Sequence, residues 1–444
     1  MADDDRFDDE QRSSEIESET PEAPEPARGG WLTKSTWVAL AVLFGLACFM
    51  FGILAQREVF TTDGIQIGGS SDEGADKVDT VMNLLEGEYY YRPTDPEASP
   101  FAQTLEDNAI HGMTAGLNDD YTMYLEPAQN APIAEQMSGE YEGIGVWVDY
   151  PDGQVRIIAP MPGSPAEQAG LESGDILLEA DGTSLKGLSD DQTLSLIRGP
   201  AGTTVKLTVQ REGEPQPLVL DVTRAKITTP SVIYTRVGPN GSIAHIAVTV
   251  FGDNTTAQLD AAVQQAKRDG VTGVVLDLRN NGGGWVKAAQ EMIGRFVTPE
   301  HGPALYEDDD PTDTAMQSEP ILAGDVNAYD LPMVVLVNEG TASASEIVTG
   351  ALRDYNRATI IGENTYGKGV VQTVHNFDDG SSLRVTSAEW LTPAKSEIQG
   401  VGIPPSIVVA DDNTTEADEQ LNAAIQALSS SPDATPQASP SPVN

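Results

Sequence analysis

The chain has 444 residues, enough for two or three domains. Its 69 acidic and 25 basic residues give a formal net charge of −44, which argues against nucleic acid or anionic lipid as a partner held by bulk electrostatics. The single cysteine, Cys48, excludes an intrachain disulfide and a cysteine metal cluster.

The chain begins with a polar tail that is followed by an apolar run. Residues 1–35 are acidic, contain proline and have almost no aliphatic side chains, so we expect a disordered tail. Residues 36–56 contain an uncharged apolar stretch, Trp37 to Leu54, which is just long enough to cross a bilayer. A cleavable signal peptide is the alternative, but the stretch has no clear small-residue cleavage site. We therefore expect a transmembrane anchor, with residues 57–75 as a linker.

Basic residues around the apolar run give a weak indication of its orientation. Arg28 and Lys34 precede the run and Arg57 follows it, so the positive-inside rule favours a cytoplasmic N-terminus. We expect a single-pass membrane protein whose bulk lies outside the cytoplasm.

Two regions with different patterns follow the linker. Residues 76–130 have apolar side chains at helical spacing, which predicts an N-terminal helical segment. Residues 131–226 contain short alternating strands with turn signals, and phrases beginning at Tyr141, Ser164 and Leu196 resemble a PDZ domain. Such domains bind a peptide as an added strand and hold its C-terminal carboxylate in a glycine turn. The resemblance assigns this peptide-binding loop to four residues: Gly143, Ile144, Gly145 and Val146.

Residues 227–410 predict a layered α/β domain. Strand, amphipathic helix, buried strand, glycine turn and helix follow one another between Ile243 and Phe296, and this order indicates βαβ units. The glycine turn at residues 280–284 leaves backbone N–H groups bare, which suits an oxyanion hole, although a tight left-handed turn is the simpler interpretation. Residues 411–444 predict a C-terminal helix and a flexible Ser/Pro tail.

A serine lies where a buried strand, Val334 to Val337, gives way to a predicted helix. Ser343 would face the positive end of the helix dipole, where free N–H groups can hold an oxyanion. However, Ser343 and Glu346 also match the capping-box pattern, so helix capping alone explains the serine. A nucleophilic role additionally requires a base.

Lys368 is the base that the sequence places best. Two glycines flank it, so the backbone can turn tightly, and apolar neighbours such as Val370 favour the neutral amine by burial. A surface turn lysine is the simpler alternative. None of the four histidines lies in a catalytic motif; His111 reads as a structural residue.

The segment from Gly362 to Lys368 also fits the start of a phosphate-binding loop. The next residue is Gly369 rather than serine or threonine, and a strand pattern follows instead of a helix, so we expect no nucleotide. The acidic stretch 307–313 has no calcium-ligand spacing, and we expect no metal or other cofactor.

Taken together, the motifs resemble the C-terminal processing peptidases, the tail-specific proteases of family S41. The resemblance rests on Ser-Ala-Ser-Glu ending at Glu346, on Gly-Lys-Gly around Lys368 and on Gln372. It implies a ClpP/crotonase-like α/β core in which Ser343 is the nucleophile, Lys368 the general base and Gln372 the residue that orients the lysine. It also implies an oxyanion hole made by two N–H groups, those of Gly283 and Ala344.

The family has proline where this chain has Gly282, so the oxyanion turn can be looser here. A further family position falls on Asp354, for which we expect a structural role. For Arg198, in the expected PDZ domain, a structural ion pair is favoured over substrate sensing. The expected activity is that of a serine endopeptidase acting on protein or peptide substrates with exposed C-termini, and a homo-oligomer is one of the open options for its assembly. A non-catalytic PDZ adaptor and a crotonase-like acyl enzyme are the alternatives.

Overall fold

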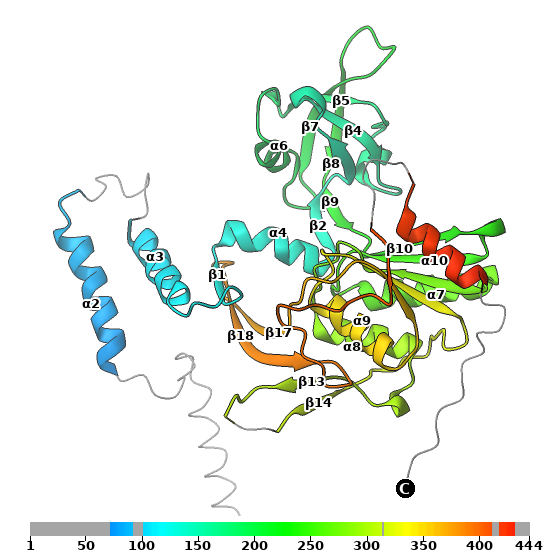
Figure 1. Ribbon diagram of the computed structural model, residues 1–444. Helices are drawn as coiled ribbons and strands as arrows, with labels where there is room; N and C mark the ends of the chain where they lie inside the picture. The colour runs from blue at the N-terminus through cyan, green and yellow to red at the C-terminus, as the bar shows by residue number, and fades with distance from the viewer. Residues whose placement is uncertain (1–71, 92–100, 313–314, 411–416, 431–444) are drawn as a thin grey trace, which may run out of the picture. The chain divides into compact units, whose positions relative to one another are not determined.

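The computed structural model describes residues 72–91, 101–312, 315–410 and 417–430 (Figure 1). The chain divides into two compact units, residues 1–88 and 89–444. The described part of the first unit is one helix, α2 (Asp72–Glu88). Its aliphatic side chains Val78, Val81 and Leu85 are exposed.

The fold-class prediction is wrong on one element, the N-terminal transmembrane helix. None of the described helices combines the length and the apolar character needed to cross a membrane. The expected anchor, residues 36–56, lies outside the described residues. The expected tail, residues 1–35, and the part of the linker that precedes α2 also lie outside them. The apolar run has only the minimum length of a spanning helix, so length alone was weak support. The extracytoplasmic location stays a prediction.

The second unit begins with a helical segment that is tied to a distant strand. It contains α3 (Phe101–Ala115), the short strand β1 (Met123–Leu125) and α4 (Pro127–Ser138). Proline at the first position of α4 and a left-handed Gly139 after it are typical helix boundaries. Strand β1 pairs with β18 (Ser382–Leu391), so this segment joins a sheet formed by residues far later in the chain.

The PDZ module is a six-stranded antiparallel sheet with a core of its own. Its strand order is β3-β4-β5-β7-β8, with β6 paired to β5, and β2 pairs separately with β9. Along β7 the alternate residues Val205, Leu207 and Val209 are fully buried, as expected for a strand with one face on the core. The elements are β2 (Glu140–Gly143), β3 (Val146–Asp149), β4 (Val155–Pro160), α5 (Pro165–Gln168), β5 (Ile176–Ala180), β6 (Thr183–Ser184), α6 (Asp190–Ile197), β7 (Thr204–Gln210), β8 (Leu218–Thr223) and β9 (Ala225–Thr228).

The larger α/β part of the second unit is built on a central six-stranded sheet. Its order is β10-β11-β12-β15-β16-β19, and all neighbours from β11 onward are parallel, while β10 is antiparallel to β11. The strands are β10 (Val232–Val237), β11 (Ile243–Val248), β12 (Gly273–Asp277), β15 (Met333–Val337), β16 (Thr359–Gly362) and β19 (Ile407–Val408).

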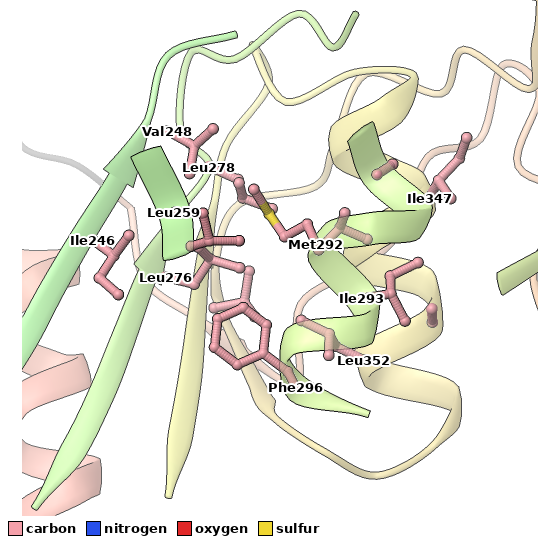
Figure 2. Close-up of a cluster of buried hydrophobic side chains, with 14 of the residues drawn as sticks. Ile246, Val248, Leu259, Leu276, Leu278, Met292, Ile293, Phe296, Ile347 and Leu352 are labelled. Carbon is pink, nitrogen blue, oxygen red and sulfur yellow. The ribbon is translucent and has the colours of Figure 1, made fainter. Parts of the chain in front are cut away.

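Helices cover both faces of this sheet. Along β12 the side chains of Val274 and Leu276 enter the larger core with α7 (Thr255–Asp269), α8 (Val286–Phe296) and α9 (Ala344–Asp354). Figure 2 shows Leu276 in this core with Met292, Ile293 and Phe296 of α8. Val275 points the other way, into a smaller core formed with α10 (Glu419–Ser430). Burial on both faces explains why the strands are continuously apolar.

A second sheet packs against the helix layer and supplies one wall of the site. It has the order β1-β18-β13-β14, with β17 also paired to β18. The side chains of Leu305 and Trp390 on this sheet are buried in the larger hydrophobic core. Its other strands are β13 (Pro303–Asp308), β14 (Gln317–Pro320) and β17 (Val370–Asn376). The layered α/β core and the mainly β module agree with the fold expected from the sequence.

Candidate active site

Ser343 occupies a strained position between β15 and α9. Its φ of 56° and ψ of −117° are rarely adopted by a residue with a side chain, and such strain collects at functional sites. The residue is the N-cap of α9, and its own N–H donates to Glu346 Oε2 at 2.8 Å, which is one half of a capping box. The capping position predicted from the sequence is therefore real, and it coexists with exposure of the serine to a cavity.

The glycine turn lies directly against Ser343. A Cβ atom on Gly283 would stand 2.8 Å from the Cβ of Ser343 and 2.9 Å from the N of Ala344, so only glycine fits here without a shift. Gly283 also has a φ of 103°, which L side chains rarely adopt. The close approach places the turn and the start of α9 side by side.

The two expected oxyanion donors differ in their hydrogen bonding. Ala344 is the first residue of α9, and N–H groups in the first turn have no intrahelical acceptor. The Gly283 N–H, in contrast, donates to Asn281 Oδ1 at 2.9 Å. Asn281 is completely buried and is itself fixed by a hydrogen bond from its Nδ2 to the carbonyl of Val248. In this structure the Gly283 N–H already has an acceptor.

Lys368 stands in the turn before β17, and a chain of hydrogen bonds fixes its amine. Nζ donates to Gln372 Oε1 at 2.5 Å, and Gln372 Nε2 donates to the carbonyl of Tyr121 at 2.5 Å. The Tyr121 ring centroid lies 5.1 Å from Nζ. The side chain of Trp390 donates to the Lys368 carbonyl at 3.0 Å and so holds the turn against β18.

The surroundings of Lys368 favour its neutral form. Burial is the main cause that lowers the pKa of Lys368 below its usual value, and the positive charge of Arg384 adds to the effect. The carboxylate of Asp119 acts in the opposite direction. Since an amine accepts a proton only when it is uncharged, this shift makes Lys368 a better base near neutral pH.

A cavity of about 270 Å³ brings the predicted residues together. Ser343, Lys368, Gln372 and Gly283 all line it. Ala344 follows Ser343 in the chain and is not among the lining residues. All four histidines of the chain lie among the described residues, and none of them lines this cavity. Apolar side chains also line it, among them Met137, Val250, Val286, Ile347, Val370, Val371, Val374 and Trp390.

The predicted peptide-binding loop lies in the PDZ module. Gly143 pairs with Ala225 in β2–β9, and Ile144 is buried in the core of the module. Gly145 has a φ of 75°, and a Cβ there would stand 2.6 Å from the Cβ of Ser164. Val146 begins β3, which is the edge strand of its sheet and is paired only with β4 within the described residues. An open edge after a glycine turn suits strand addition by a peptide.

Other singled-out residues have structural partners. Asp354, at the far end of α9, accepts hydrogen bonds from Arg353 and from the Ala394 N–H. Arg198 forms a 2.6 Å ion pair with Glu135. His111 contacts Glu126 Oε1 at 3.3 Å through its Nε2.

Sequence reasoning missed four contributors to the site. Tyr121 acts through its backbone carbonyl, so no side-chain pattern could reveal it. Asn281 lies in the glycine turn that the sequence singled out, but no role was expected for its side chain. Arg384 lies in a strand that carries no site motif. Glu346 was seen only as half of a capping box, although its carboxylate also binds the turn that holds Lys368.

Comparison with known proteins defines the class of protein. Residues 242–409 match the model of peptidase family S41, and residues 156–211 match a PDZ domain. The protein is therefore a serine peptidase that carries a PDZ domain.

Comparison with full-length proteins identifies the group of peptidases more narrowly than the domain matches do. The chain is 36% identical over 377 residues to a probable CtpA-like serine protease of Staphylococcus haemolyticus (strain JCSC1435), covering 84% of this chain and 73% of the relative. It is 35% identical over 374 residues to the corresponding protein of Staphylococcus aureus (strain bovine RF122 / ET3-1), covering 84% and 72%. The chain belongs to the CtpA-like serine proteases of family S41. Among solved structures, a photosystem II D1 C-terminal processing protease is 32% identical, with 78% of this chain and 90% of that chain covered and a TM-score of 0.43.

Proposed function

We propose that this peptidase is a tail-specific endopeptidase in which Ser343 is the nucleophile and Lys368 the general base. One observation carries the proposal: a desolvated lysine amine, held by Gln372, lines the same cavity as a strained serine at a helix N-terminus. If Lys368 were only an exposed residue of a surface turn, the hydrogen bonds from its amine to Gln372 and from Gln372 to Tyr121 would have no evident purpose. No metal or other cofactor takes part in the proposed chemistry.

The reaction begins with the neutral amine of Lys368. As Ser343 Oγ forms a bond to the carbonyl carbon of the scissile peptide, Lys368 Nζ takes the hydroxyl proton. The tetrahedral intermediate then expels the amine of the leaving peptide, which receives that proton from Lys368. A water molecule attacks the acyl-enzyme, again giving its proton to Lys368, and the acid product leaves as Ser343 recovers its hydrogen.

The oxyanion that forms in each step needs preorganised donors. The N–H of Ala344 is available at the start of α9, where the helix dipole also favours negative charge. Gly283 is the second donor in this proposal, and its N–H must be shared with, or released from, Asn281 Oδ1 when the oxyanion forms.

The PDZ module supplies selection of the substrate. In the proposal, the C-terminal residues of the substrate add to the open edge of β3, and the terminal carboxylate binds at the loop Gly143 to Val146. The apolar side chains in the lining of the active-site cavity, such as Val370 and Ile347, favour an apolar side chain next to the scissile bond.

The test uses the full chain and two peptides that differ only in their last three residues, one apolar and one acidic. We expect preferential cleavage of the apolar-tailed peptide, read by mass spectrometry, and labelling of Ser343 by a covalent serine probe. Ser343→Ala and Lys368→Ala should each abolish cleavage and leave binding of the tail intact. Cleavage by either purified variant would refute the dyad, while equal cleavage of both peptides by the unaltered protein would refute tail selection.

A further inference from the structure

Arg384 has no ion-pair partner among the described residues of this acidic protein. It lies half-buried on β18, and its Nε atom is fully buried with no hydrogen-bond partner. Within the described residues no carboxylate forms an ion pair with it, although the whole chain has 69 acidic and only 25 basic residues. Buried donors are nearly always satisfied, so the unsatisfied Nε of Arg384 requires an explanation.

The pairing of β17 with β18 places Arg384 beside the lysine site. Gln372 stands opposite Thr386, and Val374 stands opposite Arg384, so these four side chains share one face of the hairpin. Arg384 also lines the active-site cavity together with Lys368 and Gln372. The guanidinium therefore belongs to the wall that holds the amine of Lys368.

Few other charges face Lys368. The carboxylate of Asp119 favours the protonated amine, but it is already occupied by the N–H groups of Tyr121 and Thr122 and by the Thr122 hydroxyl. The Tyr121 ring offers its face to Nζ. Glu346 accepts from the backbone N–H of Lys368. Arg384 is the cation that opposes these groups.

We infer that Arg384 is a positioning residue for the peptidase reaction: its guanidinium, which lines the same cavity as Lys368, disfavours protonation of the lysine amine. The inference rests on the proposed Ser343–Lys368 dyad. A carboxylate bound to Arg384 would cancel its field at Lys368. The absence of an ion-pair partner among the described residues is thus what this role requires.

The role has a consequence for substrates. An acidic side chain that entered the cavity beside Arg384 would neutralise the guanidinium and return the proton to Lys368. Peptides with Asp or Glu near the scissile bond should therefore be cleaved more slowly at neutral pH, and the deficit should shrink as the pH is raised.

The experiment measures the pH dependence of kcat/KM with a peptide that has no charged side chain. In Arg384→Gln and in the apolar Arg384→Met, we expect the acid limb to move up by about one pH unit, which is about tenfold less activity below the limb. Arg384→Lys keeps the charge and should keep the limb. Arg268→Gln removes the same charge from the exposed face of α7 and is the matched control.

A second readout does not depend on catalysis. In the Ser343→Ala background, competitive acetylation of Lys368, mapped by mass spectrometry, gives the pH midpoint of its amine directly. We expect a higher midpoint when Arg384→Gln is added. An unchanged midpoint and an unchanged limb in a folded variant would overturn the inference. A higher KM for acidic peptides only, with the limb unmoved, would make Arg384 a substrate-binding residue instead. Full activity of Lys368→Ala would refute the proposed dyad itself. This outcome can be distinguished from failure of the inference about Arg384, because it is measured with a different variant.

Discussion

Ser343 and Lys368 donate their backbone N–H groups to the same atom, Oε2 of Glu346, at 2.8 and 2.9 Å. The other carboxylate oxygen accepts from the Thr365 hydroxyl at 2.5 Å and from the Gly367 N–H at 2.7 Å. Glu346 is completely buried, so these four donors satisfy its charge in place of water. One side chain thus fixes the start of α9 relative to the turn that carries the lysine.

The first prediction concerns Glu346→Gln. The amide would present N–H hydrogens to two donors that now meet an oxygen, and the two segments would separate. Because small misplacements of reacting groups are costly, we expect kcat to fall by about 10²-fold. We also expect the free energy of unfolding to fall by about 2–3 kcal/mol. Peptide cleavage and denaturant melts test both, with the exposed neighbour Glu339→Gln as the control that should change neither.

The second prediction concerns pH. Burial, aided by Arg384, lowers the pKa of Lys368 below its usual value of about 10.5, so the neutral base is lost as the pH falls through the folded-state pKa. We expect kcat/KM to rise with pH along a limb that reports this group, and Lys368→Met to lose activity by about 10³-fold or more. A limb that follows an ordinary lysine, near pH 10.5, would contradict the prediction.

The same shift affects stability. Between the folded and unfolded pKa values of Lys368 the unfolded chain binds more protons, so the free energy of unfolding rises with pH across that window and is lower below it. Lys368→Met removes the titrating group. We therefore expect this variant to melt at a higher temperature than the unaltered protein at neutral pH, and the difference to shrink above the window. A lower melting temperature for Lys368→Met at neutral pH would argue against a destabilising buried amine.

The third prediction uses two neighbouring glycines. In Gly283→Ala the new Cβ would meet Ser343 and Ala344 at less than 3 Å, so we expect cleavage to fall by about 10²-fold and the melting temperature to drop. Gly282→Ala adds the same methyl group where no atom lies within 4 Å. Near-normal activity of Gly282→Ala together with loss in Gly283→Ala is the expected pattern; equal effects would mean that the contact with Ser343 is unimportant.

The fourth prediction separates selection from chemistry. Gly145→Ala places a Cβ against Ser164 in the expected carboxylate loop and should reduce discrimination between apolar and acidic tails by about tenfold, mainly through KM. Gly153→Ala carries a similar positive φ, 74° against 75°, without a neighbouring atom, so it controls for backbone strain. Unchanged discrimination by a folded Gly145→Ala protein would move the peptide site away from this loop.

Local patterns revealed much of the fold in advance. The apolar runs of β12 and β15 predicted buried strands, and the structure explains their continuity, since Val275 and Val334 face α10 while Val274 and Val335 face the other helices. The serine at the start of α9 was found because a strand-to-helix junction is a local feature.

Relationships that depend on long-range pairing could not be read in this way. The pairing of β1 with β18 brings Tyr121 to Gln372, which lies 251 residues later in the chain. No local sequence pattern around Tyr121 or Gln372 predicts this contact. The occupied N–H of Gly283 likewise depends on how the buried side chain of Asn281 is oriented. The roles of the predicted site residues remain predictions for the experiments above.

The carbonyl of Tyr121 anchors the residue that holds the lysine amine, yet it belongs to a segment that precedes the PDZ module in the chain. In the proposed mechanism, the residues that serve catalysis are therefore interrupted in sequence by the PDZ module. A shortened chain that began at the PDZ strands would keep the serine, the lysine and the glutamine but lose the acceptor behind them. A fusion protein that joins this peptidase to another substrate-binding domain must therefore include the residues around β1.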